Sequence, residues 1–303
     1  MAAGYDVSKL SDYVQISKDV LVKSIVLGDK EGDTVRNLRK QLGIKTTEKL
    51  NLLDVKAVLQ DGSSCGFNAV GGSDFSEREI KTAIAKLNDE YCQLDLLSKF
   101  AEYLVKFGAE SAEDNFPFEA QILGEIARKV NKEIERQVWL GDSSGNDLID
   151  GFVTLAESAD SASTIVVAKV SGETVYDRVQ KTILAIPEEI LDDAVVFLSP
   201  ANFRALQFEM VAKNLYHYDA GKIENNDFIF PGSNVIVHKT QGLTGSDVIY
   251  ASVWDNMVYG TDMMNDREEI KVWYEEADEV ERIKIRFNFG VQTLYPDMVV
   301  INK

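Results

Sequence analysis

Residues 139 to 152, WLGDSSGNDLIDGF, follow the clearest helical pattern in the chain, which begins at Pro117. Four apolar residues recur within that pattern at every fourth position: Ile122, Ile126, Val130 and Ile134. This spacing places apolar side chains along one side of an α-helix. Proline favours the first turn of a helix, and a glycine such as Gly141 favours its end as a cap. The sequence therefore predicts a long helix over 117–140, ended by a glycine-rich turn.

Three carboxylates in this turn, Asp142, Asp147 and Asp150, raise the question of a metal site. Their intervals of five and three residues do not match a calcium loop, which needs oxygen ligands at alternate positions. A phosphate site is also disfavoured, because the glycines follow a helix, whereas anion-binding amides lie at a helix start. We therefore interpret the stretch as a polar turn with solvent-facing acids, and with Trp139 and Phe152 as apolar anchors on either side.

The charge balance of the chain limits its function. The 303 residues include 32 lysines and arginines and 50 acids, which gives a formal net charge of −18. Such an acidic protein is unsuited to following nucleic-acid phosphates over its whole surface.

Neither an apolar run of the ~18 residues that span a membrane nor a secretory signal is found, so we expect cytosolic synthesis and no membrane segment. Cys65 and Cys92 are predicted to be free thiols.

Motifs of common enzymes are missing from the sequence. No nucleotide-binding glycine loop, serine-hydrolase elbow or zinc-binding histidine pair occurs. The two histidines, His217 and His238, are interpreted as surface or structural residues. The acidic clusters at 265–269 and 275–281 contain no two carboxylates that stand out as a catalytic pair. We therefore expect no catalytic, cofactor-binding or metal-binding residues, with an acidic metal-dependent hydrolase as the enzymatic alternative.

Two stretches around a glycine-rich segment predict a long β-hairpin. Residues 52–60 and 78–87 are assigned to its strands, although a helix over 77–90 stays open as an alternative. Such a hairpin has little hydrophobic core of its own. Its tip, within 60–75, contains these glycine and aromatic residues: Gly62, Gly66, Phe67, Gly71 and Gly72.

The second half of the chain alternates between strand and helix patterns. This alternation, over 161–255, predicts a compact α/β layer. Ser199 and Pro200 fit the cap and the first position of a helix that follows a buried strand. Two alternating strands, 269–276 and 280–293, then follow. Four residues of the second strand are expected on one buried face: Ile283, Ile285, Phe287 and Phe289.

The order of these elements resembles the major capsid proteins of tailed bacteriophages, whose Hong Kong 97 fold encapsulin shells share. In that family a long helix is followed by a G-D-G-x-G-like break and a GL or GF pair. The matching positions here are Gly141, Asp142, Gly145, Gly151 and Phe152. AVVFLSPANFRALQ (194–207) and the closing strands also resemble family patterns, but Met298 stands where the family has alanine. The resemblance covers about residues 52–303.

The resemblance implies an α+β, Hong Kong 97-type capsid fold with an N-terminal arm, a long E-loop hairpin, a spine helix in a peripheral domain, and an α/β axial domain. The implied divisions are an arm at 1–50, the hairpin at 51–91, the peripheral domain at 92–160 with its spine helix at 117–140, the axial domain at 161–255, and long returning strands at 256–303.

The resemblance also implies a function. The chain would self-assemble through pentamers and hexamers into an icosahedral shell that encloses viral double-stranded DNA without sequence-specific binding. The shell would form in the host cytoplasm and become the virion capsid, with portal, scaffolding and decoration proteins as partners and no cofactor. The hairpin tip would contact a neighbouring subunit. Beside the hydrolase, the alternatives are an encapsulin-like compartment shell and a tail or sheath component.

Deletion of residues 60–75 tests the hairpin assignment. We expect the shortened subunit to fold, because the tip has no core of its own, and to form no closed shells, because the tip is predicted to contact a neighbour. Circular dichroism measures folding, and electron microscopy measures assembly. Normal particles from this variant would show that the assignment is wrong.

Overall fold

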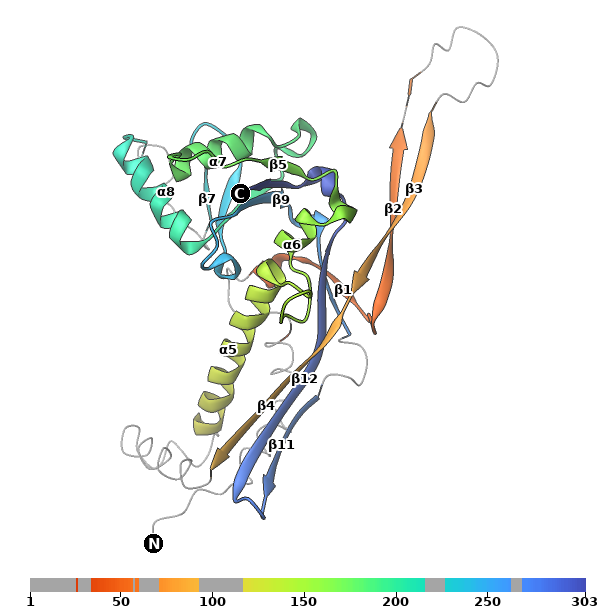
Figure 1. Cartoon of the computed structure of the whole chain (residues 1–303), viewed down its shortest axis with the longest axis vertical. Helices are drawn as coiled ribbons and strands as arrows, with labels where there is room; N and C mark the ends of the chain where they lie inside the picture. Colours follow the sequence, from red (N-terminus) through yellow and green to blue (C-terminus); the bar gives the residue numbers. More distant parts are fainter. Residues whose placement is uncertain are drawn as a thin grey trace.

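The computed structural model describes residues 26, 34–56, 58–59, 71–92, 117–215, 227–262 and 269–303. The described chain is elongated, and a two-stranded hairpin extends away from its body (Figure 1). Most of the expected hairpin tip, which includes Cys65, lies outside the described residues, as do residues 93–116 and His217. Among the described residues, no helix is long and apolar enough to cross a membrane.

The long helix, α5, spans Pro117–Leu140, as the sequence predicted. Ile126 and Ile134 are buried, and the other two members of the predicted apolar row pack against the same core from partly buried positions. One side of α5 therefore shares a hydrophobic core with the neighbouring sheet, and charged residues occupy its exposed side.

A five-stranded sheet is built around the long strand β12 (Val280–Thr293). On one side β12 pairs antiparallel with β10 (Met257–Thr261) and then with β11 (Glu269–Glu275). On its other side it pairs with β4 (Ala83–Cys92), and β1 (Arg39–Leu42) lies parallel beside β10. The alternation predicted for β12 is confirmed, since these side chains are buried: Ile283, Ile285, Phe287 and Phe289.

The hairpin consists of β2 (Thr47–Lys56) and β3 (Gly72–Lys81), paired antiparallel along their whole length. The assignment of 78–87 to one strand is wrong, because β3 ends before Thr82 and β4 begins after it. The helix considered over 77–90 is also wrong, since these residues form strands.

The break at Thr82 has a physical cause that the sequence pattern does not carry. Ile80 is fully buried at the base of the hairpin, whereas Ile84 is 55% exposed on β4. The chain therefore passes from the hairpin to the five-stranded sheet between these residues, and the two isoleucines lie in different environments. An alternation of apolar residues alone does not reveal such a change of sheet.

The second large sheet is six-stranded and contains both parallel and antiparallel pairs. Its strands, in spatial order, are β5 (Ile165–Val167), β13 (Val300–Asn302), β9 (Ile249–Val253), β6 (Ala194–Leu198), β8 (Ile236–Lys239) and β7 (Asp227–Ile229). Helices α7 (Val175–Leu184) and α8 (Pro200–Ala212) share a hydrophobic core with one face of this sheet. The predicted start of α8 is confirmed, since the Ser199 side chain accepts a hydrogen bond from the Asn202 amide at 3.3 Å.

The opposite face of the six-stranded sheet packs on the end of α5. In β6, Val196 belongs to the core under α7 and α8, whereas Val195 and Phe197 belong to the core that contains α5 and β12. One hydrophobic core therefore joins the two sheets. The remaining short helices are α2 (Thr34–Asn37), α6 (Phe152–Glu157), η1 (Ala159–Ser161), η2 (Glu188–Ile190), η3 (Gln241–Leu243), η4 (Trp254–Asn256) and η5 (Pro296–Met298).

Candidate functional site

The end of α5 is the place where the two sheets and the glycine-rich turn meet. Trp139, in the last turn of α5, is fully buried. Its ring centroid lies 5.5 Å from that of Phe152, 4.9 Å from that of Phe197 and 5.4 Å from that of Tyr250. These rings come from α6, β6 and β9. The expected pairing of Trp139 and Phe152 as apolar anchors is confirmed, and the anchor also holds the six-stranded sheet.

Gly141 and Gly151 bring the two ends of the turn into backbone contact. The Gly151 amide donates a hydrogen bond to the Gly141 carbonyl at 3.0 Å. A Cβ atom on Gly141 would lie 2.4 Å from the Ile149 carbonyl oxygen, and one on Gly151 would lie 2.6 Å from the Trp139 carbonyl carbon. Neither glycine has a positive φ, so Gly141 is required by this close approach and not by the left-handed conformation of a helix cap.

The acids of the turn accept hydrogen bonds from its backbone amides. Asp150 accepts from the Ser143 amide at 2.8 Å, and Asp147 accepts from the Asp142 amide at 3.2 Å and pairs with Arg136 of α5. The expectation that all three acids face solvent holds for Asp142 alone, because the other two are half-buried. The backbone amides just after the end of α5 need hydrogen-bond acceptors, and these carboxylates accept from them.

Arg136 also shapes the electrostatics of the turn. Its hydrogen bonds hold the pKa of Asp147 and the pKa of Glu133 below the ordinary values of these carboxyls. A carboxyl whose pKa is lowered by folding stabilises the fold above its ordinary pKa. This contribution is lost as the pH falls through the lowered values. The turn is thus held to α5 most firmly at neutral pH.

A buried polar network, which the sequence analysis missed, lies beside Trp139. The Glu135 carboxylate is buried and accepts hydrogen bonds from the Thr34 amide at 3.1 Å and from the Thr240 hydroxyl at 2.9 Å. The Thr34 hydroxyl donates to the Thr240 oxygen at 2.8 Å and accepts from the Trp139 indole nitrogen at 3.2 Å. The network therefore ties α2 to the end of α5 and to the start of η3.

Gly242, in η3, is also required at this junction. A Cβ atom there would lie 2.1 Å from the Trp139 ring and 2.4 Å from the Glu135 carbonyl oxygen. One signal in the sequence could have found the network. Glu135 lies three residues before Val138 and four before Trp139, so this acid shares its side of the helix end with two buried apolar residues.

Gly71 and Gly72, the described members of the predicted tip, do not lie at this junction. Gly71 and Gly72 are exposed where β3 begins, and the other three tip residues lie outside the described ranges. His238 is buried, and its Nδ1 atom contacts the Asp227 carboxylate, which fits the structural role expected for it. Within the described part of the chain, no group of three or more histidine, cysteine or acidic side chains is placed to hold a metal ion.

Alanine substitutions at the glycines of the turn test the close approach. We expect Gly151→Ala to lower the free energy of unfolding by roughly 1 to 3 kcal/mol, because the new methyl group would press on backbone atoms that cannot rotate away. The matched control is Gly145→Ala, whose Cβ would lie 3.4 Å from its nearest neighbour, an ordinary contact. Urea unfolding of the unassembled subunit measures both. Equal effects would contradict the close approach.

Removal of the Glu135 carboxylate tests the buried network. We expect Glu135→Ala to destabilise the subunit by roughly 2 to 4 kcal/mol, since buried amide and hydroxyl donors lose their acceptor. Glu125→Ala, which removes an exposed partner of Arg128 on the same helix, should change stability by less than about 1 kcal/mol. Thermal unfolding followed by circular dichroism compares the variants. A Glu135 variant as stable as the Glu125 control would contradict a stabilising role for the buried network.

No protein-family model and no curated protein matches the sequence. The structure is similar to the capsid of an empty GTA particle, with a TM-score of 0.60 and 12% identity over 90% of each chain. It is also similar to the procapsid of satellite phage P4, with a TM-score of 0.62 and 9% identity over 100% of this chain and 92% of the other.

A third similar structure comes from an archaeon. The virus-like particle from Pyrococcus furiosus has a TM-score of 0.55 and 8% identity, over 96% of this chain and all of the other. The similar structures thus cover nearly the whole chain from end to end, although few residues are identical. The chain therefore has the α+β, Hong Kong 97-type fold of phage major capsid proteins.

Proposed function

We propose that this chain is a major capsid protein that self-assembles through pentamers and hexamers into an icosahedral shell around viral double-stranded DNA. The observation that carries the proposal is the similarity of nearly the whole chain to capsid and procapsid subunits. A fold alone does not establish a function, so the surface of the subunit has to support the same conclusion.

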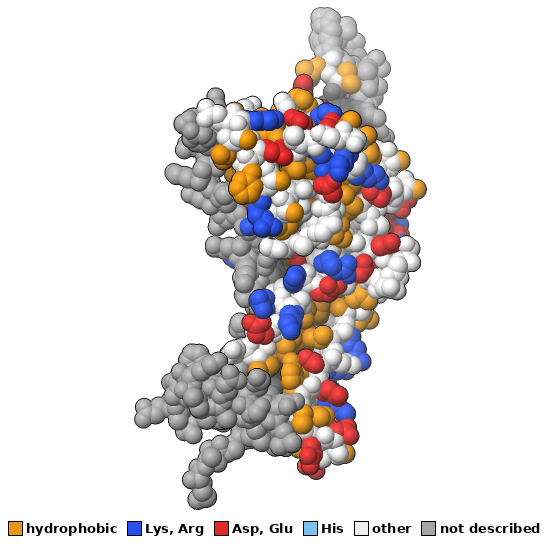
Figure 2. Space-filling model, turned by 60° about the vertical axis from the view of Figure 1, so that its left-hand side comes forward, with side chains coloured by type: hydrophobic (Ala, Val, Ile, Leu, Met, Phe, Trp, Pro, Cys, Tyr) orange, Lys and Arg blue, Asp and Glu red, His pale blue; other side chains and the backbone are white. Residues whose placement is uncertain are grey.

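The hairpin supports assembly because it exposes apolar side chains just beyond the small core at its base. Phe75 is 81% exposed and lies opposite Leu53, which is 51% exposed, and Val55 follows on the same side of β2. Exposed apolar side chains that gather on one surface mark contacts with other molecules. On the face shown in Figure 2, hydrophobic side chains are likewise exposed between charged side chains of both signs.

The parts of the chain receive roles in this proposal. The arm at 1–50 and the hairpin at 51–91 reach neighbouring subunits, with the tip residues Gly62, Gly66, Phe67, Gly71 and Gly72 in contact. The peripheral domain at 92–160 contains α5, and the turn at 141–152 sets its direction relative to the axial domain at 161–255. The strands at 256–303 join the two domains, as both sheets include strands from this range.

The acidic balance supports a container for DNA. A net charge of −18 per subunit repels the phosphate backbone, so the wall would not bind the packed DNA tightly. Portal, scaffolding and decoration proteins belong to the proposal as partners, with assembly in the host cytoplasm. An encapsulin-like shell with protein cargo is the second candidate, supported by the similarity to a virus-like particle.

Electron microscopy of the purified protein tests the proposed function. We expect closed particles in negative stain, made of five-fold and six-fold clusters of subunits. Nuclease-protected DNA and a portal-bearing vertex in particles isolated from infected cells would separate a phage capsid from an encapsulin-like shell, which would hold protein. Tubes would favour a tail or sheath component. Monomers at every protein concentration and salt condition, with and without co-expressed partners, would overturn the assignment to a shell.

A further inference from the structure

A cluster of cations occupies the surface at α2 and β1 of this acidic chain. Arg36 and Arg39 are exposed, and Lys40 is half-buried. Within the described residues, none of these three side chains forms an ion pair or a hydrogen bond. Burial and the nearby charge of Arg36 both lower the pKa of Lys40. Arg36 and Lys40 are therefore close together, and within the described residues no acid is paired with any of the three cations.

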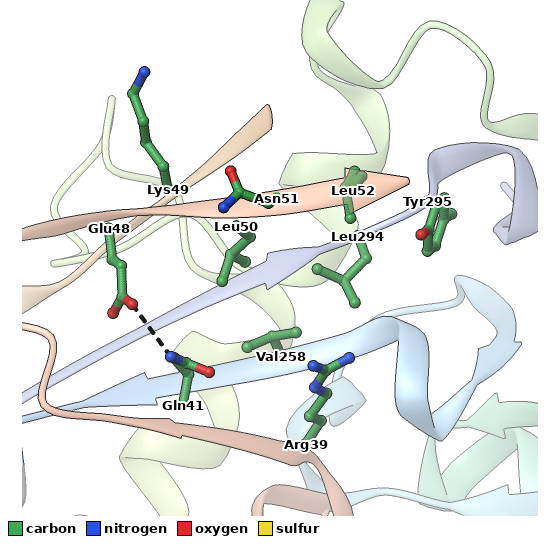
Figure 3. Close-up of a pocket in the computed structure, with 10 residues that line it drawn as sticks. All are labelled: Arg39, Gln41, Glu48, Lys49, Leu50, Asn51, Leu52, Val258, Leu294 and Tyr295. Carbon is green, nitrogen blue, oxygen red and sulfur yellow. Dashed lines mark hydrogen bonds between the residues drawn. The ribbon is translucent and has the colours of Figure 1, made fainter. Parts of the chain in front are cut away.

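A groove of 240 Å³ lies beside this cluster, between β1 and the base of the hairpin. Figure 3 shows Arg39 pointing into the groove from β1, while Leu50, Val258 and Leu294 point toward one another across its floor. Lys49 points away from the groove toward its partner Glu77. The groove thus has an arginine at one end of an apolar floor, and Tyr295 lies beside the Leu294 part of that floor.

The volume of the groove indicates what it accepts. Pockets for small-molecule ligands usually measure about 300 to 1,000 Å³, so this groove is better suited to a few side chains of a protein segment. Arg39 and the apolar floor fit a segment that carries both carboxylates and apolar residues. Glu48, the one acid among its lining residues, accepts a hydrogen bond from Gln41 at 3.2 Å and, within the described residues, forms no ion pair with Arg39.

The chain contains such a segment at η2 and the residues after it, 188–193. Four exposed carboxylates lie within these six positions, and none of them forms an ion pair in the described chain: Glu188, Glu189, Asp192 and Asp193. Ile190 and Leu191 between them pack against the subunit's own core, so the exposed apolar side chain near these acids is that of Leu184, at the end of α7. The acidic turn between β11 and β12 is a weaker match, because Arg282 already pairs with Glu275 and Asp278 there.

We infer that the acidic segment 188–193 of one copy of this chain docks on Arg36, Arg39, Lys40 and the adjoining groove of the next copy. The inference rests on the proposed self-assembly and adds the surfaces that meet. Subunits with a net charge of −18 repel one another, so an interface that pairs the uncompensated cations with acids offsets part of that repulsion. Different surfaces meet in such a contact, which makes it head-to-tail and able to close into rings.

Charge reversal tests the contact. Arg36→Glu with Arg39→Glu reverses the groove side, and Glu188→Lys with Glu189→Lys reverses the acidic side; all four residues are exposed. We expect each double variant to fold and to raise the protein concentration needed for assembly roughly tenfold or more, since like charges then face each other. The variant with all four changes should assemble near the wild-type concentration. Lys129→Glu with Lys132→Glu, on the exposed side of α5, is the control for net charge.

The outcomes separate this inference from the proposed function. A wild-type protein that never self-associates overturns both. If the wild-type protein forms particles and the groove variant assembles normally, only the docking contact is overturned. The same holds if the α5 control shows an equal assembly defect, or if the four-change variant does not recover assembly. Normal particles that lose packaged DNA in the groove variant would assign the cations to phosphate binding instead.

Disulfide cross-linking gives an independent readout. Arg39→Cys and Glu189→Cys are combined in a chain whose Cys65 and Cys92 are replaced by serine. Under mild copper-catalysed oxidation, a head-to-tail contact should give a ladder of covalent oligomers on a non-reducing gel. Each single-cysteine variant should give no more than a dimer. Absence of the ladder in assembled particles would contradict the contact.

Discussion

The burial of the Trp139 ring is the interaction on which the rest of the structure depends. It lies at the end of a long helix and contacts rings from α6, β6 and β9, so it belongs to the core of both sheets. A ring at this point fixes the direction in which α5 leaves the six-stranded sheet. Because Gly151 and Gly242 approach the same residue more closely than any side chain would allow, the position of the ring is set from several sides.

Hydrogen bonds fix the orientation of the helices that meet at this apolar junction. Apolar packing alone tolerates small rotations, whereas Glu135 must accept from the Thr34 amide and from the Thr240 hydroxyl at the same time. Leaving either donor unsatisfied in a buried position costs free energy, so α2, α5 and η3 keep one arrangement. The segment before β1 is thereby placed by the same network, and with it the edge strand beside β10.

The local patterns of the sequence predicted the elements better than their connections. The apolar row of α5 and the alternation of β12 are periodic over many residues, so both elements were found. The passage from hairpin to sheet at Thr82 was missed because alternation continues across it. Glu135 was missed because a buried acid is recognisable only once its partners, about 100 residues away in sequence, are known. Its position one turn before the apolar residues Val138 and Trp139 was the single available signal.

The hairpin is anchored at its base and extends beyond it. A small cluster holds its base on β10: Ile44, Leu52, Ile80, Val258 and Leu294. Four residue pairs, from Leu53 to Lys56 on β2, extend past the last buried one. At ~3.3 Å per residue this overhang measures about 13 Å, so a tilt of about 10° at the base moves its end by roughly 2 Å. In the proposed shell, subunits of identical sequence would thereby reach neighbours at unequal spacings, while the junction at Trp139 keeps its geometry.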